Sequence, residues 1–109
     1  MVFVTGMGVI AATGPNLEAF ARGVFEGRSG LGPTRDMARP AHQDPRGGIV
    51  EVIRCPENVD HEVWQRWDRT VRMSILAALE AIEGAALSRG ALAAKPAALY
   101  AGTAQGATG

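Results

Sequence analysis

The sequence lacks several features that would assign it at once to a class of protein. It contains one cysteine, Cys55, among 109 residues, so an internal disulfide is excluded. Eleven basic and eleven acidic residues cancel, which gives no bulk charge for binding nucleic acid or an anionic membrane. No apolar run approaches the roughly 18 residues that a membrane-spanning helix needs. Residues 1–6 lack the basic start of a signal peptide. The composition predicts a soluble, cytoplasmic protein with no membrane or nucleic-acid partner.

What is present fits one small globular domain. The length suffices for one such domain, and a hydrophobic content of 47% is typical of a folded core rather than of disorder. Several of the 14 glycines follow apolar runs, where they are expected to form turns.

The longest helical pattern in the chain covers residues 60–89. Asp60 is a predicted N-cap, and the run Ser88-Arg89-Gly90 is a predicted stop. Large apolar residues recur along the pattern at helical spacing. They are Trp64, Trp67, Val71, Ile75, Ala78, Leu79, Ile82 and Ala86.

A second stripe of this predicted helix carries only small side chains. It consists of Ser74, Ala77, Ala78, Ala81 and Ala85. An ordinary surface helix has one apolar stripe and one charged face, but between Arg72 and Leu87 only Glu80 and Glu83 are charged. The pattern therefore predicts a helix buried on two sides, with the small stripe allowing a neighbour to come close. A chain this short can hardly bury both sides by itself.

Strand candidates alternate with helices along the chain. Residues 2–4 are apolar without polar alternation, which is typical of a strand buried on both faces. Residues 49–53 and 97–101 are two further strand candidates. Strands that alternate with helices indicate an α/β protein with parallel pairing.

An amphipathic helix is predicted between the first two strand candidates. Asn16 is a good N-cap for it, and Gly27 is expected to end it. Gly23 within this helix costs roughly 1 kcal/mol relative to alanine. Residues 28–48 show no usable periodicity and are predicted to form a long surface loop. A loop of that length is usually functional or belongs to a larger architecture.

The run Gly6-Met7-Gly8-Val9-Ile10-Ala11 matches a dinucleotide-binding fingerprint after a strand. The fingerprint requires a helix to begin at once, but Gly14-Pro15 intervenes before Asn16. It also requires an acidic residue after a second strand, whereas Glu26 falls within the first predicted helix. A tight turn that needs glycine backbone freedom is the favoured interpretation.

Other residues with chemical potential are weaker candidates. Cys55 sits in an Arg-Cys-Pro-Glu turn without a demonstrable histidine partner, so an incidental cysteine is favoured over a catalytic one. His42 and His61 with one cysteine do not give metal-ligand spacing, so no metal site is predicted. Four charged residues lie at the head of the long predicted helix. We interpret them as side chains of a solvated first turn rather than as a contact for an acidic partner. They are Arg66, Asp68, Arg69 and Arg72.

Taken together, these pieces resemble the N-terminal part of the β-ketoacyl-acyl carrier protein synthases, the condensing enzymes of fatty acid and polyketide synthesis. The resemblance covers nearly the whole chain and keeps its order. Val2-Phe3-Val4-Thr5-Gly6-Met7-Gly8-Val9-Ile10 is similar to the family's opening strand and turn, and Gly27-Arg28-Ser29-Gly30-Leu31-Gly32-Pro33 to the loop after the first helix. Trp67-Asp68-Arg69 resembles the head of its long helix, and Tyr100-Ala101-Gly102-Thr103 the following strand and turn.

The resemblance implies that residues 1–109 are a partial N-terminal domain of a thiolase-like layered α/β fold. It also implies that the small stripe of the long helix lies against a counterpart helix from outside the chain. It also implies a dimeric enzyme that condenses acyl and malonyl thioesters on acyl carrier protein by decarboxylation, without a cofactor. The family's cysteine nucleophile and two histidines lie downstream of this region. Cys55, His42 and His61 match none of them, so no catalytic residue is assigned.

The resemblance assigns one candidate substrate-binding loop. Gln105 and Gly106 align with the family's acyl-pocket loop, where the residue at Gln105 is usually apolar. Glutamine there puts the usual acyl-chain preference in doubt. The segment Thr34-Arg35-Asp36-Met37 also lacks the family's usual aromatic residue.

Three hypotheses follow for the function. The first is the N-terminal part of a ketosynthase, inactive by itself. The second is a non-catalytic, chain-length-factor-like or interaction subunit of the same fold. Sequence downstream of Gly109, with or without the nucleophilic cysteine, would separate these two. The third is a small nucleotide-binding α/β protein, which nucleotide titration would test.

Overall fold

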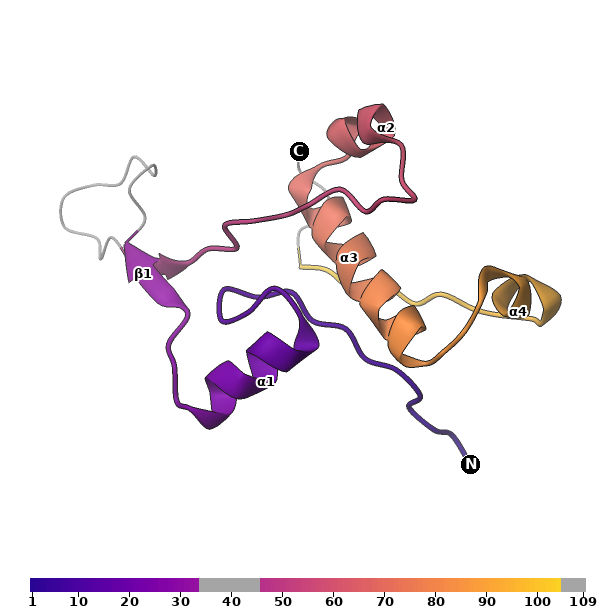
Figure 1. Ribbon diagram of the computed structural model, residues 1–109, viewed down its shortest axis with the longest axis horizontal. Helices are drawn as coiled ribbons and strands as arrows, with labels where there is room; N and C mark the ends of the chain where they lie inside the picture. Colours follow the sequence, from indigo (N-terminus) through magenta and orange to yellow (C-terminus); the bar gives the residue numbers. More distant parts are fainter. Residues whose placement is uncertain (34–45, 105–109) are drawn as a thin grey trace. The chain divides into compact units, whose positions relative to one another are not determined.

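The computed structural model describes residues 1–33 and 46–104 (Figure 1). Its elements are α1 (Leu17–Phe25), β1 (Leu31–Pro33), β2 (Arg46–Gly48), α2 (His61–Arg66), α3 (Arg69–Gly84) and α4 (Arg89–Ala94). The described part of the chain thus mixes helices with one small sheet, as an α/β composition requires. The chain divides into two compact units, one of Met1–Gly8 with Ile53–Gly109 and one of Val9–Val52.

Helix α1 in the Val9–Val52 unit begins and ends as its sequence predicts. The Asn16 side chain accepts a hydrogen bond from the Ala19 amide at 2.9 Å, which satisfies one of the free donors of the first turn. At the other end Gly27 has φ +67°, and the Arg28 amide donates to the Gly23 carbonyl at 2.8 Å. This is the Schellman arrangement, which favours glycine because the residue is left-handed.

The segment before α1 explains why glycine is used inside the helix. Gly23 is buried, and a Cβ built there would lie 3.3 Å from the carbonyl oxygen of Thr13. Ala11 and Gly14 exchange two backbone hydrogen bonds of 3.0 and 3.1 Å in a tight turn. The close packing of this turn on α1, which Gly23 permits, therefore offsets the low helix propensity of glycine.

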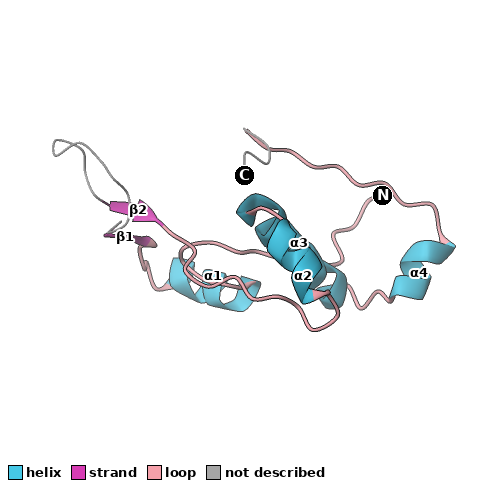
Figure 2. Ribbon diagram, turned by 90° about the horizontal axis from the view of Figure 1, so that it is seen from above, coloured by secondary structure: helices cyan, strands magenta, loops and turns pink. Residues whose placement is uncertain are grey.

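The sheet of the described residues is a short antiparallel pair (Figure 2). Strands β1 and β2 pair in the register Leu31↔Gly48, Gly32↔Gly47 and Pro33↔Arg46. Two predictions are wrong here. Residues 28–48 are not all loop, and the second strand ends at Gly48 instead of covering residues 49–53. The pairing is antiparallel rather than parallel, because the two strands belong to one hairpin-like excursion without a crossover helix between them.

The predicted long helix is two helices in the Met1–Gly8 and Ile53–Gly109 unit. Asp60 caps α2 as predicted, accepting from the Val63 amide at 3.0 Å. Trp67 then leaves the helical region with ψ 143°. Asp68 starts α3 by accepting from the Val71 amide at 3.0 Å. The prediction of a single helix over residues 60–89 is therefore wrong, because Asp68, within the first third of the pattern, acts as a new N-cap.

The C-terminal end of α3 repeats the capping geometry of α1 with a different residue. Ala86 has φ 56°, and the Leu87 amide donates to the Ile82 carbonyl at 3.2 Å. Ser88, predicted as part of a stop signal, is instead the N-cap of α4, where its hydroxyl accepts from the Ala91 amide at 3.1 Å. Helix α4 has no counterpart in the sequence-based prediction.

The two outer strand candidates form no ladder in the described residues. Residues 2–4 and 97–101 belong to neither strand of the sheet. Val4 is 80% exposed and Leu99 is 91% exposed. A strand is assigned by its pairing with another strand, and neither segment pairs with any of the described residues.

The hydrophobic core of the described residues is small. Among the described residues, the large hydrophobic side chain that is buried is that of Trp64, with 2% of its surface exposed. No residue of α3 is buried, so the predicted burial of this helix on two sides is not realised. Its large apolar residues are half-covered, because little described chain lies around them. Of the described helices, none combines the length and the apolar character needed to cross a bilayer.

Candidate functional site

The N-terminal glycine turn lies directly against α3. A Cβ built on Gly6 would lie 2.0 Å from the carbonyl oxygen of Ala81, and one on Gly8 would lie 1.9 Å from that of Ala77. Both distances are far below any ordinary contact of a Cβ atom. The two glycines therefore bring backbone against backbone, which no other residue permits at these positions.

The direction of this contact follows from the same distances. Gly6 faces Ala81 and Ala85, whereas Gly8 faces Ala77, so the segment runs antiparallel to α3. Two residues of the segment cover one helical turn, about 6 Å of helix axis, and two fully extended residues span about 6.6 Å. The chain is therefore nearly extended where it crosses the helix.

This contact identifies the neighbour of the small stripe. Ala77, Ala81 and Ala85 were expected to face a counterpart helix from outside the chain, but they face the chain's own residues 6–8. The expectation of a close neighbour was correct, and the expected partner was wrong. A stripe of small residues predicts that a neighbouring segment packs closely on the helix, but it does not predict which segment that is.

The same contact favours the structural interpretation of the glycine fingerprint. Gly6 and Gly8 use their freedom to approach α3, and α1 begins only at Leu17 after its Asn16 cap. A phosphate site of the fingerprint type needs the glycines to open a helix directly. The geometry thus weighs against the nucleotide-binding hypothesis.

A tryptophan–arginine cluster joins α2 to α3. The rings of Trp64 and Trp67 meet edge to face with centroids 6.1 Å apart, and the Arg72 guanidinium lies 5.8 Å from the centre of the Trp64 ring. Arg72 Nη2 donates to the Gln65 carbonyl at 2.8 Å. Among the described residues, Arg72 Nε is buried without a hydrogen-bond partner.

This cluster revises the interpretation of the charged residues at the head of α3. Arg66 and Arg69 are exposed, as a solvated turn predicts. Asp68 is the helix cap, and Arg72 stacks on an aromatic face and holds the end of α2. Residues eight apart in one continuous helix lie about 12 Å apart along its axis, so this contact depends on the break between α2 and α3, and the helical pattern carried no signal for it.

Cys55 is not placed for nucleophilic chemistry by its described neighbours. Its thiol is half-buried and lies 3.5 Å from the carbonyl oxygens of Pro56 and Val59. The His61 ring lies 3.2 Å from the Gln65 side chain instead. Within residues 1–33 and 46–104, no group of three His, Cys, Asp or Glu side chains could hold a metal ion. His42 lies outside the described residues.

The predicted acyl-pocket loop is described only in its first part. Gly102 and Thr103 are exposed, and a Cβ built on Gly102 would meet nothing within 4 Å. Gln105 and Gly106, the candidate substrate-binding residues, lie outside the described residues. Their role stays a prediction.

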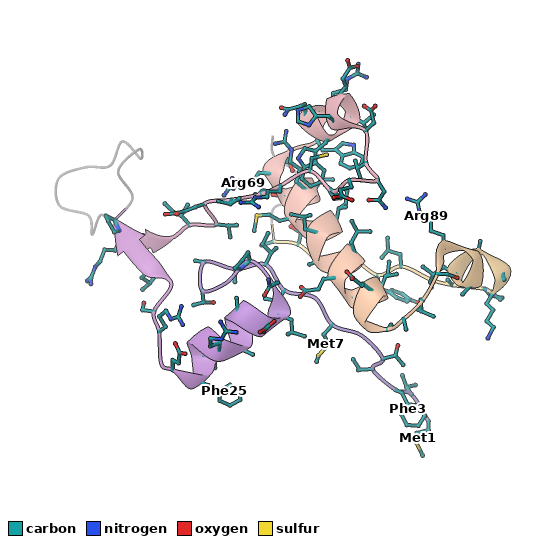
Figure 3. All side chains as sticks on the ribbon, in the orientation of Figure 1. Met1, Phe3, Met7, Phe25, Arg69 and Arg89 are labelled. Atoms are coloured by element: carbon teal, nitrogen blue, oxygen red, sulfur yellow. The ribbon has the colours of Figure 1, made fainter. Side chains whose placement is uncertain are left out.

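Exposed apolar side chains are prominent at the N-terminus and near residue 100. Figure 3 shows the side chains of Met1 and Phe3 projecting from the chain beyond the end of α3. Val2 is 95% exposed and Phe3 is 73% exposed. Leu99 and Tyr100 are exposed to more than nine-tenths as well. Each of these two segments thus carries a short run of exposed apolar side chains.

Comparison with known proteins gives consistent relatives. The 3-oxoacyl-[acyl-carrier-protein] synthase 2 of Synechocystis sp. is 31% identical over 86 residues, which cover 79% of this chain and 21% of that protein. The actinorhodin polyketide putative beta-ketoacyl synthase 2 of Streptomyces coelicolor is 27% identical, covering 77% of this chain and 21% of that protein. The 3-oxoacyl-[acyl-carrier-protein] synthase 1 of Buchnera aphidicola is 26% identical, with coverages of 80% and 21%.

The chain spans about one fifth of the length of these curated relatives. No solved structure gives a significant match. The model of the beta-ketoacyl synthase N-terminal domain matches residues 1–109, which is the whole sequence. The chain therefore belongs to the beta-ketoacyl synthase family and corresponds to its N-terminal domain.

Proposed function

We propose that this chain is the N-terminal portion of a β-ketoacyl-acyl carrier protein synthase with a thiolase-like layered fold. The observation that carries the proposal is the family match over residues 1–109, together with relatives of which this region covers 21%. The complete enzyme joins an acyl thioester to a malonyl thioester by decarboxylative condensation. The catalytic cysteine and histidines belong to the portion of the fold beyond this region.

The part of the chain that the structure describes suits a scaffolding role in such an enzyme. Gly6 and Gly8 fix the N-terminal segment on α3, and the Trp64–Arg72 contact fixes α2 on the head of α3. Neither arrangement presents a nucleophile or a general base. We assign to the chain the positioning of the sheet and helix layers, and to Gln105 and Gly106 a place along the acyl channel.

The partners of the complete protein follow from the same proposal. Acyl carrier protein would deliver both thioesters, as the printed names of the Synechocystis and Buchnera relatives indicate for those proteins. A homodimer or heterodimer of condensing-enzyme folds is the proposed assembly. The net charge of zero over residues 1–109 supplies no bulk attraction for acidic partners, so docking of the carrier would depend on local basic side chains or on the rest of the fold.

A chimera tests this function. The matched region of the Synechocystis synthase would be replaced by residues 1–109, and condensation of acyl and malonyl thioesters on acyl carrier protein would be measured. We expect condensing activity, because the chain would supply the scaffold and the relative would supply the nucleophile. The same chimera with its nucleophilic cysteine replaced by alanine is the negative control, and Cys55→Ala should leave the activity within about twofold.

The isolated chain provides the complementary measurement. Incubated with radiolabelled acyl thioester, residues 1–109 should form no acyl-enzyme. Acylation of Cys55 would contradict the assignment of the nucleophile to another part of the fold. A folded chimera that binds acyl carrier protein without condensing would contradict the scaffolding role proposed for residues 1–109.

A further inference from the structure

The joint between α2 and α3 interrupts an apolar pattern that continues through it. Trp64, Trp67 and Val71 keep the spacing of one helical stripe, yet Trp67 has ψ 143° and Asp68 begins a new helix. Figure 1 shows the change of direction between the two helices. The apolar pattern is compatible with one continuous helix, so local contacts must hold the joint bent.

Arg72 supplies two of these contacts, and both depend on the bend. Its guanidinium lies 5.8 Å from the centre of the Trp64 ring, and its Nη2 donates to the Gln65 carbonyl at 2.8 Å. In a continuous helix, residues 64 and 72 would lie about 12 Å apart along the axis, and the Gln65 carbonyl would accept from the Arg69 amide instead. The Arg72 side chain therefore replaces a helical hydrogen bond that the bend removes.

Asp68 supplies a third contact that favours the bend. Its carboxylate accepts from the Val71 amide at 3.0 Å, and a side-chain cap of this kind competes with propagation of a helix through it. In a continuous helix the Thr70 amide would donate to the Arg66 carbonyl. Among the described residues, no backbone hydrogen bond joins these two groups, so the Thr70 amide distinguishes a bent joint from a straight one.

The bent joint also carries an opposing cost. Within the part of the chain that the structure describes, Arg72 Nε is buried and has no hydrogen-bond partner. A buried donor without an acceptor is unfavourable. The bend is thus a balance between the contacts of Arg72 and Asp68 on one side and this unpaired donor, together with the lost helical hydrogen bonds, on the other.

We propose that the joint is a conformational device with two states, bent and straight, and that Arg72 is the positioning residue that selects the bent state. In the straight state residues 61–84 form one helix. Arg72 thereby sets the direction in which α2 presents its exposed side chains, among them Glu62 and Arg66. The inference does not depend on the proposed function, because it concerns contacts within residues 60–84.

The test is hydrogen exchange of the Thr70 amide, measured by mass spectrometry with single-amide resolution in residues 1–109 and in the Arg72→Ala variant at matched concentration. We expect exchange at Thr70 to slow by about tenfold in the variant, the factor that one net hydrogen bond supplies. Tryptophan emission should shift to longer wavelength at the same time, because Trp64 loses the side chain that lies over its ring.

Asp68→Ala is an independent test with the same expected sign. If Asp68 acted only as the cap of α3, its loss would let the first turn fray, and exchange at Thr70 would become faster. If the joint has a straight state, alanine lets the helix propagate, and exchange becomes slower. The matched control is Arg66→Ala, which removes an exposed guanidinium from the same joint and should change exchange by less than about twofold.

The outcomes separate a two-state joint from a merely structural contact. Faster or unchanged exchange at Thr70 in Arg72→Ala and Asp68→Ala would show that loss of these contacts only loosens α2, and would overturn the inference. Slower exchange with unchanged tryptophan emission would overturn it too, because the straight state takes Trp64 away from residue 72. An equal slowing in Arg66→Ala would assign the effect to the helix propensity of alanine and not to Arg72.

Discussion

At the scale of single residues, Gly8 carries the most stringent requirement in the described chain. Its absent Cβ would lie 1.9 Å from the carbonyl oxygen of Ala77 and 3.0 Å from the Ala81 amide nitrogen. These are backbone atoms of a helix, which cannot rotate away as a flexible side chain can. The N-terminal segment would have to leave α3 to make room for one methyl group.

We therefore expect Gly8→Ala to destabilise the unit by about 1–3 kcal/mol, the usual cost of forcing atoms into a packed contact. Urea denaturation followed by tryptophan fluorescence measures the change, since Trp64 and Trp67 flank the start of α3. Gly102→Ala is the matched control, because a Cβ there meets nothing within 4 Å. Equal stability of the two variants would show that Gly8 does not lie on α3.

Arg72 shows a different kind of residue-scale constraint. Its guanidinium lies over Trp64, the most buried hydrophobic side chain described, and donates to the end of α2. The planar fork suits both contacts at once, whereas a lysine ammonium cannot match that geometry. One residue thus links two helices whose backbones are separated by a break.

At the scale of elements, the two ends of α3 are closed by local side-chain and backbone geometry. Asp68 caps the first turn, and Ala86 adopts a left-handed conformation after the last. The left-handed region costs a non-glycine residue roughly 1–2 kcal/mol. In α1 the same position is held by Gly27, which does not pay this cost.

Substituting Ala86→Gly should accordingly stabilise the end of α3. Part of the relieved strain is offset by the entropy that glycine loses on folding, so the expected net gain is about 0.5–1 kcal/mol. The free energy of opening, measured by hydrogen exchange of the Leu87 amide, reports on this end directly.

The control for this substitution has the opposite expected sign. Ala78 lies within α3 and is exposed. Ala78→Gly should therefore destabilise the helix by about 1 kcal/mol. If Ala78→Gly and Ala86→Gly shifted stability in the same direction, the role assigned to Ala86 would be contradicted.

The elements also show which features a sequence can specify by itself. Asn16, Asp60 and Gly27 were predicted as helix signals and act as such, because each works through atoms a few residues away. The break at Trp67 was missed, because apolar periodicity continues across it and does not register that Asp68 starts a new helix. A sequence therefore predicts a helix cap at the end of an apolar pattern, but a cap residue within a continuous pattern is easily overlooked.

The strands were predicted less well for a physical reason. Residues 2–4 and 97–101 have strand composition, yet a strand also needs a pairing partner, which composition alone does not specify. The pair β1–β2 was missed, because Gly32, Pro33 and Gly47 carry little strand propensity. Gln105 and Gly106 lie outside the described residues, so the acyl-pocket assignment stays a prediction that rests on family resemblance.

At the scale of the whole molecule, the described residues leave much apolar surface in water. Trp64 is their buried large hydrophobic residue, whereas Val2, Phe3, Leu99 and Tyr100 are each at least 73% exposed. Side chains of this size each contribute about 1.5–3 kcal/mol when fully buried. Exposed apolar surface of this kind favours self-association of the isolated chain.

The isolated chain at micromolar concentration should therefore bind an apolar fluorescent dye, sediment as oligomers and melt over a broad temperature range. Replacing Val2, Phe3 and Val4 together by serine should lower both dye binding and oligomer size, because these apolar side chains are each at least 73% exposed. The matched control replaces three exposed polar residues, Glu57, Asn58 and Arg66, by serine and should change neither. A monomer with a sharp cooperative transition and no dye binding would mean that residues 1–109 cover their own apolar surface. In that case no partner fold would be required to cover Val2, Phe3 and Val4.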